Sequence, residues 1–115
     1  MPQITVDYSA ALEEDFDRRG YALALHPVVV ETTGARLPAC KTRTRRTQET
    51  VIADGGADES LIHITVSLFA GRSEEAKAAL AEAAVALTAG FLKPGLPPVH
   101  ISAEVRDLDP SYRQN

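Results

Sequence analysis

Proline at position 2 is the residue of this chain with the most distinctive chemistry. If Met1 is removed, its nitrogen becomes a free secondary amine, which no other residue type provides at a chain end. An ordinary α-amino group has a pKa of about 7.7–8.0, and an apolar pocket lowers that value because it disfavours the ammonium form. Such an amine is a general base at neutral pH. The structural alternative is that Pro2 only begins a strand, where its missing N–H is tolerated.

Basic residues supply the positive charge that such a base uses. Lys41, Arg43 and Arg45 alternate along one face of an expected strand, and Arg72 follows Gly71 just before an expected helix. A local group of cations of this kind can bind a small anion. The alternatives are a solvated strand face, a nucleic-acid patch and, for Arg72, a loop arginine. A cation gains nothing from the dipole at a helix N-terminus, which favours a separate purpose for Arg72.

The other reactive side chains have structural explanations. Cys40 is expected to be a small buried hydrophobe, and His63 a packed, hydrogen-bonded residue. Ser9 and Ser73 fit helix caps better than nucleophiles. The three histidines and the single cysteine lack the spacing of metal ligands, so we expect no metal and no cofactor.

Composition narrows the functional class. A chain of 115 residues suits one domain, and a single cysteine excludes an internal disulfide. The net charge of −4 and an aromatic content of 5% without tryptophan disfavour a nucleic-acid partner. There is no apolar run of membrane-spanning length and no signal-peptide pattern. We therefore expect a cytoplasmic protein without a membrane partner.

The first half of the chain, approximately residues 1–52, has a strand–helix–strand pattern. Strands are expected over residues 2–7 and 39–51, with a helix over 10–33 between them. Ser9 would cap this helix, Pro27 would kink or restart it, and Gly34 would end it.

The second half, approximately residues 60–108, repeats the pattern after a turn-rich connector over 53–60. Strands are expected over 61–68 and 99–106, and between them a helix that begins at Ser73. The buried stripe of this helix is expected to comprise Ala76, Leu80, Ala83, Leu87 and Phe91.

Two strand–helix–strand units predict an α+β, two-layer sandwich in one domain, residues 1–115. Its four-stranded sheet would be mixed and would carry both helices on one face. The open face is expected to carry Thr5, Thr42, Thr44, His63 and Thr65. A closed homo-oligomer would cover such a surface.

This layout, together with Pro2 and the cations, resembles the tautomerase superfamily, and within it the 5-carboxymethyl-2-hydroxymuconate isomerase family. The similarity runs through nearly the whole chain, and the order and spacing of the motifs fit that family. The firmest matches are Ala53-Asp54-Gly55, Ile62-His63-Ile64-Thr65 and Ala70-Gly71-Arg72-Ser73. Weaker ones are Pro27, Thr33-Gly34, Leu108-Asp109-Pro110 and Asn115.

The resemblance implies a duplicated βαβ subunit in a trimer, with the N-terminal proline, Pro2, as catalyst in a pocket at each subunit boundary. It also implies two arginines for substrate carboxylates. One matches Arg72. The other aligns with Lys41 in Lys41-Thr42-Arg43, where the family pattern resembles Arg-Ser-Arg, or with Arg43 if the alignment has a small gap. Lysine keeps the charge but not the planar bidentate geometry.

Three functions follow from these observations. The first is a cofactor-independent isomerase that shifts a proton in a small carboxylated enol, such as 5-carboxymethyl-2-hydroxymuconate, in aromatic-acid breakdown. The second is a hydrolytic relative in which Pro2 helps to activate water, which requires an extra acidic residue in the pocket. The third is a trimeric binding module without turnover, which the lysine at position 41 keeps open.

Overall fold

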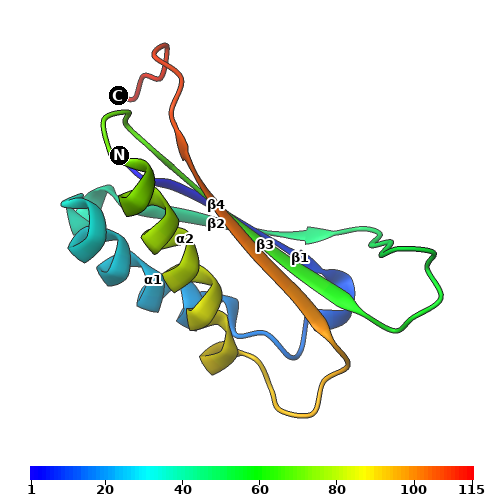
Figure 1. Ribbon diagram of the computed structural model, residues 1–115. Helices are drawn as coiled ribbons and strands as arrows, with labels where there is room; N and C mark the ends of the chain where they lie inside the picture. Colours follow the sequence, from blue (N-terminus) through cyan, green and yellow to red (C-terminus); the bar gives the residue numbers. More distant parts are fainter.

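The computed structural model describes residues 1–115 as a four-stranded sheet with two helices on one of its faces (Figure 1). The strands are β1 (Gln3–Ser9), β2 (Lys41–Thr47), β3 (Ser60–Leu68) and β4 (Val99–Asp107). The helices are α1 (Arg18–Thr33) and α2 (Glu74–Leu87). Short 3-10 turns are η1 (Ala10–Leu12), η2 (Leu37–Ala39) and η3 (Thr88–Phe91).

The strand order is β2-β1-β3-β4. β1 and β2 are parallel and joined through α1, and β3 and β4 are parallel and joined through α2. The two units meet at the antiparallel pair of β1 and β3 in the centre. The predicted α+β fold, with a mixed sheet and two βαβ units, is therefore confirmed.

The core lies between the sheet and the helices because β3, and β1 as far as Tyr8, alternate between buried and half-buried residues. The helices close it with one apolar stripe each. The fully buried members of this core are Ile4, Val6, Ile62, Ile64, Val66, Tyr21, Leu25, Val29, Leu80 and Ala84. The inward residues of β4 remain half-buried because β4 is an edge strand.

The first helix begins later than its pattern predicts. α1 starts at Arg18, not at residue 10, and Asp17 caps it by accepting a hydrogen bond from the Gly20 N–H. Ser9 caps no helix. Its hydroxyl instead accepts a hydrogen bond from the N–H of Leu61 at 2.8 Å, so its polar group joins β1 to β3.

α1 runs without a break through Pro27, so of the predicted kink or restart the restart does not occur. A proline deprives the carbonyl four residues earlier of its donor. Here that carbonyl belongs to Leu23, whose side chain is exposed like Pro27, so water can replace the missing N–H. The predicted stop at Gly34 is confirmed, with a φ of 75° and its N–H bonded to the Val30 carbonyl.

The two faces of β2 differ from the expectation in one respect. Thr42 and Thr44 lie on the helix side, not on the open face: the Thr42 hydroxyl is 2.7 Å from Nε2 of His26 in α1, and Thr44 lines a hollow beside the start of that helix. The alternation of β2 leaves Lys41 and Arg43 on the opposite, open face. β2 also ends at Thr47, four residues before the predicted boundary.

The cap of the second helix is as predicted. The Ser73 hydroxyl accepts a hydrogen bond from the Ala76 N–H. The buried stripe differs by one position, because Ala84 rather than Ala83 is fully enclosed together with Leu80. α2 ends at Leu87, and the chain tightens into η3.

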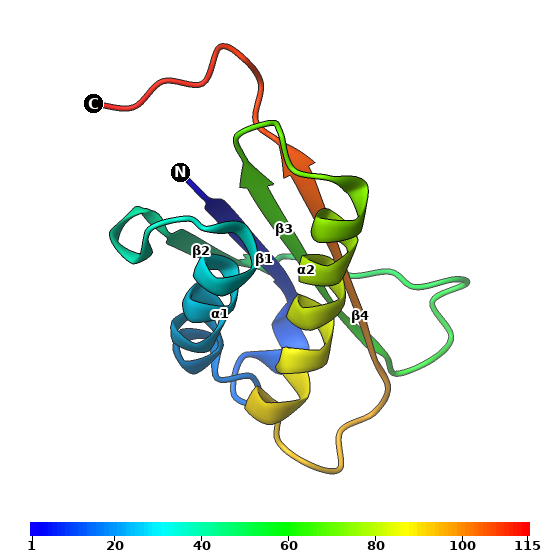
Figure 2. The ribbon, with the colours of Figure 1, turned by 60° about the vertical axis from the view of Figure 1, so that its left-hand side comes forward.

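Both chain termini lie at the same end of the sheet, near the end of α1 and the loop that leads into α2 (Figure 2). The parallel register pairs Gln3 with Lys41, so the N-terminus meets the beginning of β2. The loop between β2 and β3, which contains Ala53-Asp54-Gly55, lies at the opposite end (Figure 1). The fold therefore gathers the candidate chemical groups at one end of the sheet.

Candidate active site

Pro2 lies at the entrance to β1 and is buried. Its carbonyl accepts a hydrogen bond of 3.2 Å from the backbone N–H of Lys41. In this structure Met1 precedes it, so the free amine belongs to Met1 and the Pro2 nitrogen is an amide. Met1 lies against Arg36, Pro38 and Ala39, with which it lines a cavity of about 330 Å³.

Arg72 is half-buried in the loop between β3 and α2. Its guanidinium donates to the carbonyl of Phe69 at 2.9 Å and to the carbonyl of Thr33 at 3.1 Å. Gly71 precedes it with a φ of 122°, a conformation that essentially only glycine adopts. Two of the five N–H donors of a guanidinium are thus used to fix its position.

The N-terminal amine lies in an environment that weakens its affinity for a proton. Burial is the main cause that lowers its pKa from the ordinary value, and the positive charge of Arg72 is the second. Cys40 acts in the opposite sense, and Lys41 lowers the pKa further. The fold therefore brings the amine, Arg72 and Lys41 within electrostatic reach of one another.

Cys40 is buried as expected, and burial raises the pKa of its thiol. Its Sγ contacts the carbonyl of Arg36 at 3.8 Å. A thiol whose proton is held more tightly is a poor nucleophile. Cys40 therefore acts as a packed member of the hydrophobic core.

Arg43 points to other partners than Lys41 does. Its Nη1 donates to Oε1 of Gln3 at 3.0 Å, and its Nη2 is 3.5 Å from the Thr5 hydroxyl. Arg45, two residues farther, forms two hydrogen bonds with Asp7, at 2.8 and 3.1 Å. Lys41, Arg43 and Arg45, the cations on this face of β2, therefore have three different surroundings, and Lys41 is the one beside the amine.

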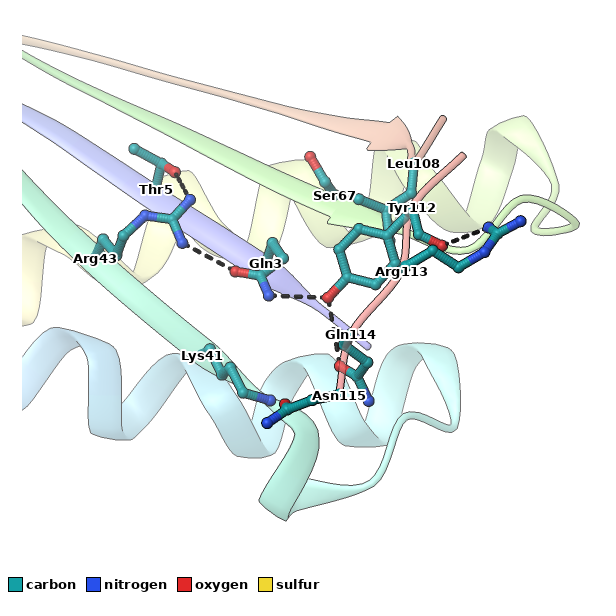
Figure 3. Close-up of a pocket in the computed structure, with 10 residues that line it drawn as sticks. All are labelled: Gln3, Thr5, Lys41, Arg43, Ser67, Leu108, Tyr112, Arg113, Gln114 and Asn115. Atoms are coloured by element: carbon teal, nitrogen blue, oxygen red, sulfur yellow. Dashed lines mark hydrogen bonds between the residues drawn. The ribbon is translucent and has the colours of Figure 1, made fainter. Parts of the chain in front are cut away.

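A cavity of about 590 Å³ opens on the sheet face away from the helices, next to the N-terminal end of β1 (Figure 3). The C-terminal segment crosses it. Its lining residues come from β1, β2, β3 and that segment: Gln3, Thr5, Lys41, Arg43, Ser67, Leu108, Tyr112, Arg113, Gln114 and Asn115. The lining contains three basic side chains and no Asp or Glu, so it suits an anionic ligand.

The sequence pattern indicated Lys41 and Arg43 but not Gln3 or Tyr112. Alternation along β1 places Gln3 on the open face, and that signal was available in the sequence. The position of Tyr112 had no such signal, because the residues after β4 show no periodicity. Only the path of the chain across the cavity brings Tyr112 to Gln3.

His63 lies outside this cavity. Its Nδ1 is 2.7 Å from the Ser102 hydroxyl, and its Nε2 is 3.6 Å from a Glu104 carboxylate oxygen. The predicted hydrogen bonding of His63 is confirmed, but its side chain is 37% exposed and is therefore not packed in the core. No three side chains of the His, Cys, Asp or Glu types converge as metal ligands would, and no helix has the length and apolar character needed to cross a bilayer.

The sequence model of the 5-carboxymethyl-2-hydroxymuconate isomerase family matches residues 2–115. This chain belongs to that family. The match begins at Pro2 and includes Lys41 and Arg72. Membership supports an isomerase of the tautomerase superfamily, whose fold the chain shares. A search of the curated proteins gives no match.

Solved structures share the fold. A 5-carboxymethyl-2-hydroxymuconate isomerase from Deinococcus radiodurans R1 is 23% identical, with a TM-score of 0.76 over 99% of this chain and 89% of that one. A 5-carboxymethyl-2-hydroxymuconate delta-isomerase is 20% identical, with a TM-score of 0.76 over 100% and 87%. A fused 4-OT symmetric trimer is 24% identical, with a TM-score of 0.71 over 92% and 85%.

Proposed function

We propose that this protein is a cofactor-independent isomerase that shifts a proton in a small carboxylated dienol, with Pro2 as the general base. The substrate class is that of 5-carboxymethyl-2-hydroxymuconate, after which the family is named. The observation that carries the proposal is the convergence of the buried end of β1, Lys41 and Arg72 around the N-terminal amine.

Removal of Met1 would transfer the amine by one residue, to the Pro2 nitrogen. Consecutive Cα atoms are about 3.8 Å apart, so the new amine stays near the same cations and the same buried surface. Burial and like charge both disfavour the prolinium form. We therefore expect the Pro2 amine to be neutral, and hence basic, near pH 7.

In the proposed reaction the neutral Pro2 nitrogen takes a proton from the enol hydroxyl or from a carbon of the substrate. The products of this step are a prolinium and a dienolate. The prolinium then returns its proton to another carbon of the conjugated chain, so the double bonds move and no atom is gained or lost. No redox partner is required for this proton shift.

Arg72 and Lys41 would stabilise the negative charge that develops between the two proton transfers. Arg72 keeps three N–H donors beyond the two that hold backbone carbonyls, and its position is fixed by those two bonds. A donor that is already oriented loses little by reorganisation when the charge appears. Lys41 supplies a second charge, with Arg43 set farther along the strand.

We expect the protein to act as a trimer with its pockets at the subunit boundaries. The sheet face away from the helices has no cover in a single chain, and it carries half-buried polar residues such as Thr5, His63 and Thr65. A fused 4-OT trimer has the same fold. Light scattering should give three times the chain mass of 12.3 kDa. A monomer that is fully active would contradict the boundary pocket.

The hydrolytic alternative lacks the residue that it needs. Activation of water beside Pro2 requires an acidic partner. The cavity that opens next to Gln3, the residue after Pro2, has no Asp or Glu in its lining. The isomerase is therefore the better supported function.

The decisive experiment compares wild type with Pro2→Ala and Arg72→Ala. The N-terminal residue of each sample is established by intact mass. Isomerisation of 5-carboxymethyl-2-hydroxymuconate and of 2-hydroxymuconate is then followed by absorbance. Loss of one positioned general base should lower kcat by about 10²–10⁴-fold.

Two results would contradict the proposal. One is undiminished activity of Pro2→Ala. The other is a fully active sample in which Met1 is retained, because the Pro2 nitrogen is then an amide without basicity. Absence of turnover in a well-folded wild type with a free Pro2 would favour the binding module instead.

A further inference from the structure

Gln3 connects a cation of the cavity to the C-terminal segment (Figure 3). Its Oε1 accepts a hydrogen bond from Arg43 Nη1 at 3.0 Å, and its Nε2 donates to the Tyr112 hydroxyl at 3.0 Å. A guanidinium has no acceptor, so the oxygen of the Gln3 amide must face Arg43 and its nitrogen must face Tyr112. The hydrogen bond to Tyr112 therefore holds the Gln3 amide in the orientation in which its oxygen accepts from Arg43.

Tyr112 is itself held in place from two directions. Its ring meets the Phe69 ring edge to face, with centroids 5.9 Å apart and an interplanar angle of 78°. The segment that carries it is attached to the end of β3 by a 2.6 Å hydrogen bond from the Leu108 N–H to the Leu68 carbonyl. Tyr112 is half-buried, whereas its neighbours Ser111 and Arg113 are exposed. The hydroxyl is thus a fixed acceptor for Gln3.

Lys41 and Arg43 occupy alternate positions of β2, opposite Gln3 and Thr5. Residues two apart on a strand are separated by about 6.6 Å, which is on the scale of a short dicarboxylate. A ligand with one carboxylate at Lys41 would therefore bring its second carboxylate to Arg43. The cavity volume of about 590 Å³ is ordinary for a small-molecule site.

We infer that Tyr112 is a positioning residue for a dicarboxylate substrate: it orients Gln3, which holds Arg43 ready for the carboxylate distant from the reacting carbon. The inference rests on the proposed function, since it assumes that the substrate enters this cavity. Tyr112 takes no part in proton transfer. Its effect falls on binding of the second carboxylate and not on the chemical step.

The test uses the full-length protein and two unreactive probes, adipate with two carboxylates and hexanoate with one. Binding of each to wild type, Tyr112→Phe and Ser111→Ala is measured by calorimetry. Tyr112→Phe keeps the ring on Phe69 and removes only the hydroxyl. Ser111→Ala is the matched control, because Ser111 lies in the same segment but bonds only to Asp109.

Loss of the Tyr112 hydroxyl should raise the Kd for adipate about three- to tenfold, in keeping with the loss of one hydrogen bond. The Kd for hexanoate should change less than twofold, and Ser111→Ala should match wild type for both. With the true substrate, KM should rise by the same factor as the adipate Kd while kcat stays within twofold. A double-mutant cycle with Gln3→Ala should be non-additive, since both residues act through one contact.

A second readout comes from tyrosine labelled with ¹³C in its ring. The chain has three tyrosines, and Tyr8 and Tyr21 are buried with partners of their own, Glu13 and the Ala84 carbonyl. Adipate should shift the Tyr112 signal, assigned by its absence in Tyr112→Phe, and leave the other two unchanged.

Equal adipate affinity of wild type and Tyr112→Phe would overturn the inference and leave the isomerase proposal intact. Absence of adipate binding to wild type would overturn it as well, whatever Pro2 does. A raised Kd for adipate in Tyr112→Phe, together with full activity of Pro2→Ala, would support the positioning role of Tyr112. The same pair of results would reject Pro2 as the general base. The two proposals therefore fail in distinguishable ways.

Discussion

The guanidinium of Arg72 donates a hydrogen bond of 3.1 Å to the backbone carbonyl of Thr33, the last residue of α1. This bond joins the two βαβ units at the end of the sheet where the N-terminal amine lies. Arg72 is therefore both a structural tie and a charge beside the amine. The two roles make different predictions for different substitutions.

Arg72→Ala should lose both roles, whereas Arg72→Lys should keep the charge and lose the paired geometry. Each hydrogen bond contributes about 0.5–1.5 kcal/mol, so Arg72→Ala should lower the free energy of unfolding by about 1–3 kcal/mol. Denaturant unfolding measures this change, and steady-state kinetics measure activity. If Arg72→Lys is folded but loses as much activity as Arg72→Ala, geometry rather than charge is the requirement.

Activity should depend on pH through the N-terminal amine. The base is active only when neutral, so kcat/KM should rise with pH through the pKa of the amine. Burial and Arg72 lower the pKa of the Met1 amine from its ordinary value of 8.0. The Pro2 amine that replaces it after Met1 removal would lie beside the same groups, so the midpoint of the rising limb should lie below pH 8.0. A midpoint at or above this value would contradict a basic amine in this environment.

Lys41→Gln should move the same limb to higher pH, because it removes one of the charges that lower the amine pKa. Lys93→Gln is the matched control, since Lys93 is exposed and pairs with Asp15 at 3.8 Å, outside the site. The pH profiles of the two variants decide between a specific role for Lys41 and a general effect of net charge. If the midpoint moves by the same amount in both variants, the effect is one of net charge.

Gly71→Ala should destabilise the loop that carries Arg72. Nothing lies within 4 Å of a Cβ added at Gly71, so the cost is conformational and follows from its φ of 122°. Such a backbone strain costs about 1–3 kcal/mol. Gly90→Ala is the control: the space around it is also open, and its φ is not in the positive range. Thermal unfolding should therefore show a lower Tm for Gly71→Ala and a Tm close to that of wild type for Gly90→Ala.

Tyr21→Phe should destabilise the protein without reducing the intrinsic chemistry. The Tyr21 hydroxyl donates to the Ala84 carbonyl at 2.7 Å inside the core. In a regular helix the Thr88 N–H would donate to this carbonyl, but here it donates to the Val85 carbonyl. Loss of the hydroxyl removes this donor from the buried Ala84 carbonyl, at a cost of about 1–3 kcal/mol in the free energy of unfolding. Denaturant unfolding checks the stability, and kcat at a temperature far below unfolding should be unchanged.

The sequence by itself determined the fold class. Alternating apolar residues such as Ile62, Ile64 and Val66 can bury one side of a strand in only one way, and two strand–helix–strand patterns permit few topologies. It also determined the stop of α1 at Gly34 and the cap of α2 at Ser73, because both depend on a single local residue type.

Only the tertiary structure decided what the polar side chains do. Ser9 has the residue type of a helix cap, but its hydroxyl bonds across the sheet to Leu61, a partner remote in sequence. In the same way, strand periodicity cannot show that Lys41 lies beside the amine while Arg43 turns to Gln3, nor that Tyr112 meets Gln3 across 109 positions. A hydrogen bond depends on distances of a few tenths of an ångström, and those distances exist only once the chain has packed.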